Sequence, residues 1–263
     1  MGYVKNPQEI ARIEHALSHP RFVNGEMLSI DFLTDHDVVA EILPPPLVPS
    51  AAPALNAMIG RWQSNCVGDF YGGAIYVDAR HRDVEGRYVL SMWMNGDVPT
   101  IYGRDVFGEP KKLAESRLHR RGDQYTAWLE RGGVRLLELT AELPEDRGPS
   151  EAAGVNFNFK ARPAADGVGL EEDAILTQAR FETTVRVHRA GTGTLTLQGT
   201  VHDPVDTLPV RAITQATYLE CDLVGHCEAV ATVPADVFLP YHYGRQDDWS
   251  ALDTERAMLA AVS

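Results

Sequence analysis

The chain has 263 residues, which is long enough for one substantial hydrophobic core, and we interpret residues 1–263 as a single domain. Its formal net charge of −13 disfavours nucleic acid and anionic membrane surfaces as partners, because both would repel an acidic protein. The N-terminal residues lack a signal-peptide pattern and no apolar run approaches membrane-spanning length, so the sequence predicts a cytoplasmic protein. The three cysteines, Cys66, Cys221 and Cys227, suggest neither a zinc site nor a disulfide framework.

The first predicted element is a helix that begins at Asn6-Pro7-Gln8-Glu9. Asn6 is a suitable N-cap, Pro7 suits the first helical position, and Glu9 can reach back to the cap. Apolar residues then recur at helical spacing, and Pro20 ends the pattern. Alternating apolar residues predict a strand over Met27–Phe32, and Asp35 is expected to begin a short helix that the prolines Pro44–Pro46 stop.

Most of the remaining chain predicts strands separated by glycine-containing or charged turns. Arg131-Gly132-Gly133 indicates a hairpin, Gly191-Thr192-Gly193 is expected to join two strands, and Pro144–Gly154 has the composition of a surface loop. Short helical stretches are expected at Val98–Phe107 and Pro234–Phe238. The predicted strands are Ala54–Trp62, Asp69–Ala79, Tyr88–Asn95, Gln124–Glu130, Val134–Leu143, Asn156–Arg162, Ala174–His188, Thr194–His202 and Leu208–Val233.

These elements predict a mainly β (α+β) fold, with an antiparallel barrel-like core and a few peripheral helices. Regular strand–helix alternation is missing, which weighs against a (β/α)₈ barrel. The chain has no glycine-rich nucleotide motif and no histidine spacing typical of a metal site, so we expect neither a cofactor nor a metal.

The stretch Ile101–Leu113 carries the residues of greatest chemical interest. It places Lys111 and Lys112 directly after Pro110 in largely apolar surroundings. Burial disfavours the ammonium form of lysine, and the neutral amine can attack a carbonyl carbon to form a Schiff base. On composition alone the alternative, a solvated lysine pair at the start of a strand, is favoured because lysine is mostly a surface residue.

A family resemblance supports the Schiff-base interpretation. Gly103-Arg104-Asp105 followed by Pro110-Lys111-Lys112-Leu113 resembles the Gly-Arg-Glu…Pro-Lys-Lys-Leu signature of the acetoacetate decarboxylase superfamily. Further similar landmarks extend the resemblance from about Asn24 to Tyr243; they are Thr34-Asp35, Pro44-Pro45-Pro46-Leu47 and Asp206-Thr207-Leu208-Pro209-Val210. The resemblance implies a β-barrel-like core with the lysine inside, Lys111 as the residue that forms the Schiff base, and a homo-oligomer.

Several side chains are candidates to assist Lys111. If Glu109-Pro110-Lys111 is extended, Glu109 shares a face with Lys111 while Lys112 faces the other way. Glu109 is then a candidate general acid or base, and a solvated carboxylate at a turn is the alternative. We also list Tyr241 as a catalytic candidate that could close the pocket, and Tyr71, Arg61 and Lys112 as substrate-binding candidates. Plain packing is the alternative for Tyr241, and a surface position is the alternative for Arg61.

The departures from the family pattern bear on the reaction. Acetoacetate decarboxylases carry an arginine just before the strand that corresponds to 27–32, and glutamates in the strands that correspond to 54–75. Here Gly25, Asn56 and Gly72 stand near those places, and in this respect the chain looks like the aldolase–dehydratases of the superfamily.

Three functions therefore follow as hypotheses. The first is a cofactor-independent lyase in which Lys111 condenses with a 2-oxo acid, pyruvate being the first candidate, for aldol addition or cleavage and dehydration, with an aldehyde as the possible second substrate. The second is a β-keto acid decarboxylase that uses the same Schiff base. The third is a non-catalytic barrel that binds a small ligand.

Overall fold

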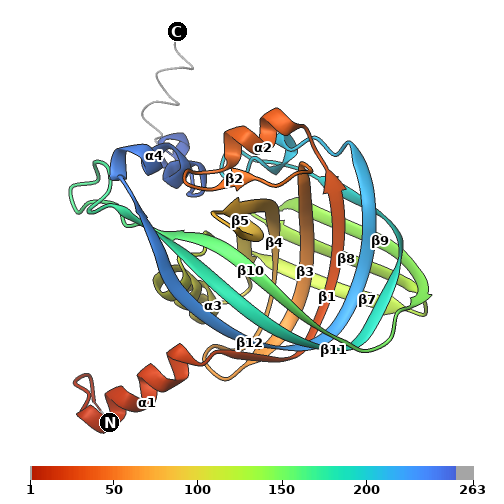
Figure 1. The fold of residues 1–263 in the computed structure, drawn as a ribbon, viewed down its shortest axis with the longest axis horizontal. Helices are drawn as coiled ribbons and strands as arrows, with labels where there is room; N and C mark the ends of the chain where they lie inside the picture. Colours follow the sequence, from red (N-terminus) through yellow and green to blue (C-terminus); the bar gives the residue numbers. More distant parts are fainter. Residues whose placement is uncertain (1, 253–263) are drawn as a thin grey trace.

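The computed structural model describes residues 2–252, and its strands form one continuous sheet (Figure 1). The helical segments are α1 (Pro7–Ser18), α2 (His36–Ile42), α3 (Asp97–Tyr102), the π-helical turn η1 (Gly103–Phe107), η2 (Val205–Thr207), α4 (Ala235–Gly244) and η3 (Trp249–Leu252). The strands are β1 (Arg21–Leu33), β2 (Val48–Pro49), β3 (Ala54–Ser64), β4 (Gly68–His81), β5 (Val84–Met94), β6 (Lys111–Leu113), β7 (Glu115–Arg121), β8 (Gln124–Arg131), β9 (Val134–Asp146), β10 (Ser150–Lys160), β11 (Ala174–Leu197) and β12 (Ala212–Val233). None of the described helices has both the length and the apolar character needed to cross a membrane.

Seven of the strands close into a barrel. The order β10-β5-β4-β3-β1-β12-β11 returns to its start because β10 pairs with β5 on one side and with β11 on the other. The β10–β5 pair is parallel and the other neighbours in the ring are antiparallel. Where the seven strands pair, closure leaves none of them with a free edge. The backbone N–H and C=O groups that an edge strand would expose are therefore paired.

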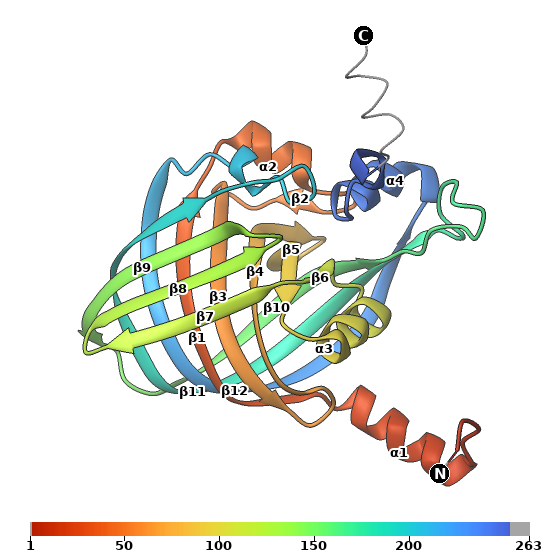
Figure 2. The ribbon, with the colours of Figure 1, turned by 180° about the vertical axis from the view of Figure 1, so that it is seen from behind.

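A second layer covers part of the outer surface of the barrel. The strands β7, β8 and β9 form an antiparallel meander that continues the sheet beyond β11 and folds back across β3 and β4 (Figure 2). The largest apolar cluster lies between this layer, the outer face of the barrel, α2 and α4, and includes Ile30, Ile59, Ile75, Leu129 and Phe238. A second apolar cluster, which includes Met58, Trp62, Phe70 and Met92, lies on the opposite face of the same strands. The lumen of the barrel therefore has a core of its own.

The first helix confirms the predicted capping box and projects from the barrel (Figure 1). The Glu9 backbone N–H donates to the Asn6 side chain, and the Glu9 carboxylate accepts from the Asn6 backbone N–H. None of the residues of α1 is buried, and the apolar positions Ile10 and Ile13 remain exposed. One contact ties the end of α1 to the barrel, since the Tyr102 hydroxyl donates to the Leu17 carbonyl.

Two parts of the predicted strand pattern are wrong in detail. The stretch over 144–154 is mostly strand rather than loop, because β9 runs to Asp146 and β10 begins at Ser150. The predicted turn Gly191-Thr192-Gly193 lies inside β11, which passes from the barrel into the second layer as one strand. A side chain at Gly191 would collide with the Glu142 carbonyl, so this glycine serves close strand approach rather than a turn.

Candidate active site

The barrel lumen holds two adjoining cavities. The inner cavity, which we call the lysine chamber, has a volume of about 120 Å³ and is lined by Lys111 and Glu109. The outer cavity, which we call the vestibule, has a volume of about 600 Å³ and receives side chains from all seven barrel strands. The two cavities share Met27, Met58, Tyr76, Asn156, Phe181 and Leu223.

Lys111 and Glu109 form a buried ion pair at the end of the lysine chamber. Lys111 Nζ lies 2.7 Å from Glu109 Oε2, and each residue is only 7% exposed. The two side chains thus share a face, as the extended Glu109-Pro110-Lys111 segment predicts. Because the carboxylate is within hydrogen-bonding distance of the amine, it can take a proton from Lys111 and return one to an oxygen bonded to the attacked carbon.

The Gly103-Arg104 motif builds the wall behind this pair. An ideal Cβ on Gly103 would overlap Glu109 Oε2 and would lie 2.5 Å from Lys111 Nζ, so the pair fits only against a glycine. Arg104 holds the main chain of β6, since its Nη1 donates to the Lys111 carbonyl at 3.1 Å. The π-helical turn ends at Gly108, whose φ of +80° is in the left-handed region that glycine adopts readily. The motif therefore positions Lys111 without contributing a reactive group of its own.

We expect Gly103→Ala to slow Schiff-base formation at Lys111 by about two orders of magnitude, because small misplacements of reacting groups have effects of this size. The rate is measured as covalent adduct formed with pyruvate and sodium cyanoborohydride. Gly96→Ala is the matched control, since a Cβ there meets nothing closer than 3.6 Å. Equal adduct rates in Gly103→Ala and Gly96→Ala would contradict the packing role of Gly103.

The walls of the lysine chamber are apolar where the family resemblance implies charge. At Gly25 a Cβ would lie 2.8 Å from Trp62 Cδ1, and at Gly72 it would lie 2.7 Å from Met94 Cε. Trp62 and Met94 therefore fill the space next to these glycines, and Trp62 stacks on Phe70 with ring centroids 5.3 Å apart. No arginine lines this cavity among residues 2–252.

Tyr76 is the further proton donor in the chamber, and the sequence analysis missed it. It is 9% exposed, it lines both cavities, and its hydroxyl makes no hydrogen bond to any described residue. Burial raises the pKa of the Tyr76 phenol and the Glu109 carboxylate raises it further, so the phenol keeps its proton at neutral pH. Strand alternation is the signal that could have found it, because Tyr76 shares a face of β4 with Phe70 and Gly72, whereas Tyr71 faces the other way.

Lys112 does not lie in the chamber, which corrects its listing as a substrate-binding candidate. Its Nζ lies 3.0 Å from Asp203 Oδ1 and 3.1 Å from Asp247 Oδ1, on the opposite face of β6 from Lys111. Arg131 bridges the same two carboxylates, with both contacts at 2.6 Å. Lys112 therefore belongs to a structural ion network that anchors β6.

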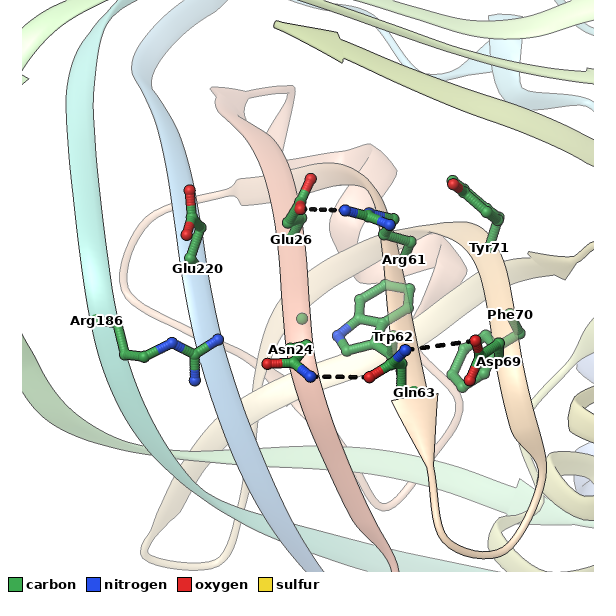
Figure 3. Close-up of a pocket in the computed structure, with 11 residues that line it drawn as sticks. Asn24, Glu26, Arg61, Trp62, Gln63, Asp69, Phe70, Tyr71, Arg186 and Glu220 are labelled. Carbon is green, nitrogen blue, oxygen red and sulfur yellow. Dashed lines mark hydrogen bonds and ion pairs between the residues drawn. The ribbon is translucent and has the colours of Figure 1, made fainter.

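Arg61 and Tyr71 also lie away from Lys111. They line a separate cavity of about 320 Å³ on the other face of β3 and β4, where Arg61 pairs with Glu26 (Figure 3). Both candidates face away from the lumen because their neighbours Trp62 and Phe70 face into it, and side chains alternate along a strand. The prediction that Arg61 and Tyr71 bind the substrate is therefore wrong for a substrate held by Lys111, because neither side chain lines the lysine chamber.

Tyr241 is likewise not brought to the lysine chamber. It lies within α4, which is longer than predicted, and its ring stacks on Phe238 with centroids 6.3 Å apart. It lines a fourth cavity, of about 230 Å³, together with Tyr88 and Arg245. Of the six candidate site residues, the structure brings together Lys111 and Glu109 and adds Tyr76.

The comparison with known families decides the identity of the fold. The family model described as acetoacetate decarboxylase matches residues 5–233. The chain belongs to the acetoacetate decarboxylase family. Curated relatives called acetoacetate decarboxylase, from Burkholderia cenocepacia (strain HI2424) and Burkholderia mallei (strain NCTC 10229), are each 31% identical over 210 residues, covering 77% of this chain and 84% of the relative. The predicted acetoacetate decarboxylase resemblance and the predicted mainly β fold are thus confirmed.

Solved structures of the acetoacetate decarboxylase fold align over most of the chain. The acetoacetate decarboxylase from Legionella pneumophila superposes with a TM-score of 0.74 at 26% identity, covering 81% of this chain and 87% of that one. The enduracididine biosynthesis enzyme MppR, solved with the condensation product of pyruvate and imidazole 4-carboxaldehyde, gives 0.69 at 17% identity, covering 80% and 88%. An acetoacetate decarboxylase-like enzyme from Sphingomonas wittichii RW1 gives 0.70 at 15% identity, covering 82% and 93%. The last two likenesses concern the fold alone.

Proposed function

We propose that this protein is a cofactor-independent carbon–carbon lyase in which Lys111 forms a Schiff base with a 2-oxo acid, with pyruvate as the first candidate. The observation that carries the proposal is the buried pair of Lys111 and Glu109, 2.7 Å apart, in a chamber that also contains the Tyr76 phenol. A neutral amine next to a proton acceptor is the requirement for attack on a carbonyl carbon.

The protons of imine formation can all pass through Glu109. The carboxylate accepts a proton from the Lys111 ammonium, which frees the amine to attack the carbonyl carbon of the substrate. The protonated Glu109 gives its proton to the alkoxide of the addition product and takes one from the nitrogen, which forms a neutral carbinolamine. The same acid then protonates the carbinolamine hydroxyl, and water leaves to give the iminium ion. Asn156 also lines the chamber, and its side-chain amide is a neutral donor for the substrate carboxylate.

Tyr76 favours an aldol-type reaction over decarboxylation. Decarboxylation of an iminium ion needs only one later proton, on the enamine carbon, whereas aldol addition also needs a donor for the oxygen of the aldehyde. A phenol that keeps its proton and has no partner can supply it. MppR, which shares the fold, has been solved with pyruvate and with a condensation product of pyruvate and an aldehyde, which supports pyruvate as the first candidate substrate.

Decarboxylation of a β-keto acid is the second candidate, because the curated relatives at 31% identity are called acetoacetate decarboxylase. The apolar walls also suit the conversion of a carboxylate into carbon dioxide, since they disfavour the charged form. Homo-oligomerisation and a cytoplasmic location stay predictions from the sequence.

Two measurements test the proposed function. The first is intact-protein mass after borohydride reduction with pyruvate, and separately with acetoacetate; a pyruvate adduct supports the Schiff base. The second is product analysis with pyruvate plus a panel of aromatic aldehydes. A condensation product supports the aldolase reaction, whereas release of carbon dioxide from acetoacetate favours the decarboxylase. If neither compound forms an adduct, the remaining hypothesis is a non-catalytic barrel that binds a small ligand.

We expect Tyr76→Phe to lower the rate of pyruvate–aldehyde condensation by about 10²-fold, which is the low end of general acid catalysis. The exchange of pyruvate methyl protons for deuterium, which reports the enamine alone, should be retained. Tyr125→Phe is the matched control. Its buried hydroxyl has no hydrogen-bond partner among the described residues, but Tyr125 lies in the largest apolar cluster, outside the lumen. Equal losses of exchange and condensation would assign Tyr76 a structural role instead.

A further inference from the structure

We propose that the vestibule is a subsite for a positively charged portion of the substrate, so that the carbonyl compound accepted with pyruvate carries an ammonium or guanidinium group away from its reacting end. The proposal rests on the Schiff base at Lys111 as its inner anchor. The proposal concerns the part of the substrate that lies outside the lysine chamber. Neither the chemistry of the chamber nor the fold alone predicts the charge of that part.

The two cavities differ in size and in chemistry. The chamber, at about 120 Å³, has room for little more than a small keto acid, whereas the vestibule has about 600 Å³. Sites for small organic molecules typically measure 300–1,000 Å³, so the vestibule belongs to the substrate site by size. The residues between the two cavities are mainly apolar, among them Met58, Phe181 and Leu223. A substrate that spans both therefore has an apolar segment between its two ends.

The charged lining of the vestibule is predominantly acidic. Asp31, Asp78 and Glu85 line it, and Arg87 is the one cation that residues 2–252 place in its wall. Arg87 already serves two of the carboxylates, with Nη2 3.1 Å from Asp31 and Nε 3.1 Å from Asp78. The Nε and Nη2 atoms of Arg87 are thus already engaged by aspartates, and among the described residues only its Nη1 is left without a partner for a substrate carboxylate.

The carboxylates remain accessible and are not fully compensated. The side chains of Asp31 and Asp78 are 25% and 33% exposed. Asp31 also accepts from the Asn56 amide at 2.8 Å, and Glu85 accepts from the Ser50 hydroxyl at 2.7 Å and pairs more distantly with Arg80, at 3.6 Å. Even with Arg80 counted, three carboxylates face two guanidinium groups. Burial raises the pKa of the Asp78 carboxyl, Arg87 opposes this effect, and the like charges of Asp31 and Glu85 raise it further.

An independent feature at the inner boundary points to a bound ligand. Tyr76 is nine-tenths buried, lines both cavities, and has a hydroxyl without a hydrogen-bond partner among residues 2–252. Because Tyr76 lines both cavities and its hydroxyl has no protein partner, a ligand that occupies them can accept its hydrogen bond. A substrate extending from Lys111 past Tyr76 would place its outer end beside Asp31 and Asp78.

The test uses three ketone probes that share one skeleton, 4-phenyl-2-butanone, and differ only in the para substituent: trimethylammonium, carboxamide or carboxylate. Each is incubated with the full chain and cyanoborohydride, and the rate of adduct formation at Lys111 is followed by intact mass, with pyruvate as an independent probe. We expect the cationic probe to react about tenfold faster than the neutral one, and the carboxylate more slowly, which is the order of magnitude for one unit charge several ångströms away in a partly solvated site. The ratio of the rate for the cationic probe to the rate for the neutral probe should fall as ionic strength rises, because salt screens the interaction between charges.

Variants locate the effect. Asp31→Asn with Asp78→Asn should remove the preference for the cationic probe and favour the carboxylate, because Arg87 then has no carboxylate partner in the vestibule. Asp69→Asn is the matched control, since Asp69 is on β4 like Asp78 but lines the cavity on the opposite face. Equal rates for the three probes, fastest trapping of the carboxylate probe, or trapping of pyruvate but of none of the ketones would each overturn the vestibule proposal. Failure to trap any probe, pyruvate included, would instead overturn the proposed Schiff base.

Discussion

Lys111→Ala is expected to abolish the borohydride-trapped pyruvate adduct, whereas Lys112→Met should retain it. The two lysines are adjacent in sequence but face opposite sides of β6, and only Lys111 reaches the chamber. The loss should be complete within detection, because the adduct requires the amine itself. Intact mass and peptide mapping of the reduced protein measure both variants.

Folding must be controlled in this experiment, because removing one partner of a buried ion pair leaves the other without compensation. The double change Lys111→Met with Glu109→Gln removes both charges of the pair and should unfold at a denaturant concentration close to that of the wild type. If folded Lys111→Ala still forms the adduct, Lys111 is not the nucleophile.

Asp203→Ala is expected to lower the free energy of unfolding by about 3–5 kcal/mol, the range for breaking a buried ion pair from one side. Asp203 is 3% exposed and pairs with Lys112 at 3.0 Å and Arg131 at 2.6 Å, so its removal weakens the compensation of two cations. It also accepts the indole N–H of Trp93, at 3.0 Å, which would lose its partner. Urea unfolding followed by tryptophan fluorescence and circular dichroism gives the value.

Glu172→Ala is the matched control for Asp203→Ala. Glu172 pairs with Arg162 at 3.7 Å, but both side chains are more than 60% exposed. Exposed ion pairs contribute about 0–1 kcal/mol, so this change should barely move the unfolding midpoint. Similar losses in the two variants would argue against the network of Lys112, Asp203, Asp247 and Arg131 as an anchor of β6.

Local sequence patterns predicted most of the secondary structure correctly. The capping box at Asn6 and Glu9, and the hairpin at Arg131-Gly132-Gly133, depend on contacts between neighbours in sequence, so they can be read without the fold. The glycines at 191 and 193 could not be interpreted this way. Glycine suits both a turn and a close approach of strands, and only the packing of β11 on β9 distinguishes the two.

The candidate site was predicted well near Lys111 and poorly elsewhere. Glu109 is two residues from Lys111, so the extended geometry of the chain was enough to place both on one face. Arg61, Tyr71 and Tyr241 were selected for their chemistry, but their positions depend on the faces of β3 and β4 and on the docking of α4. Tyr76 was missed because its importance arises only when the barrel closes and places β4 across the lumen from β11 and β12.

The sequence by itself determined the mainly β composition, the family and the choice of Lys111 as the proposed Schiff-base residue, because each rests on residues that are close together in the chain or in a recognisable order. Only the tertiary structure decided which side chains share the lumen with that lysine. Barrel closure brings seven strands from positions between Arg21 and Val233 around one cavity, and each strand contributes a single face to it. The registers of those strands are set by long-range pairing and by burial of both cores, so the chemistry of the chamber and the charge of the vestibule follow from the fold as a whole.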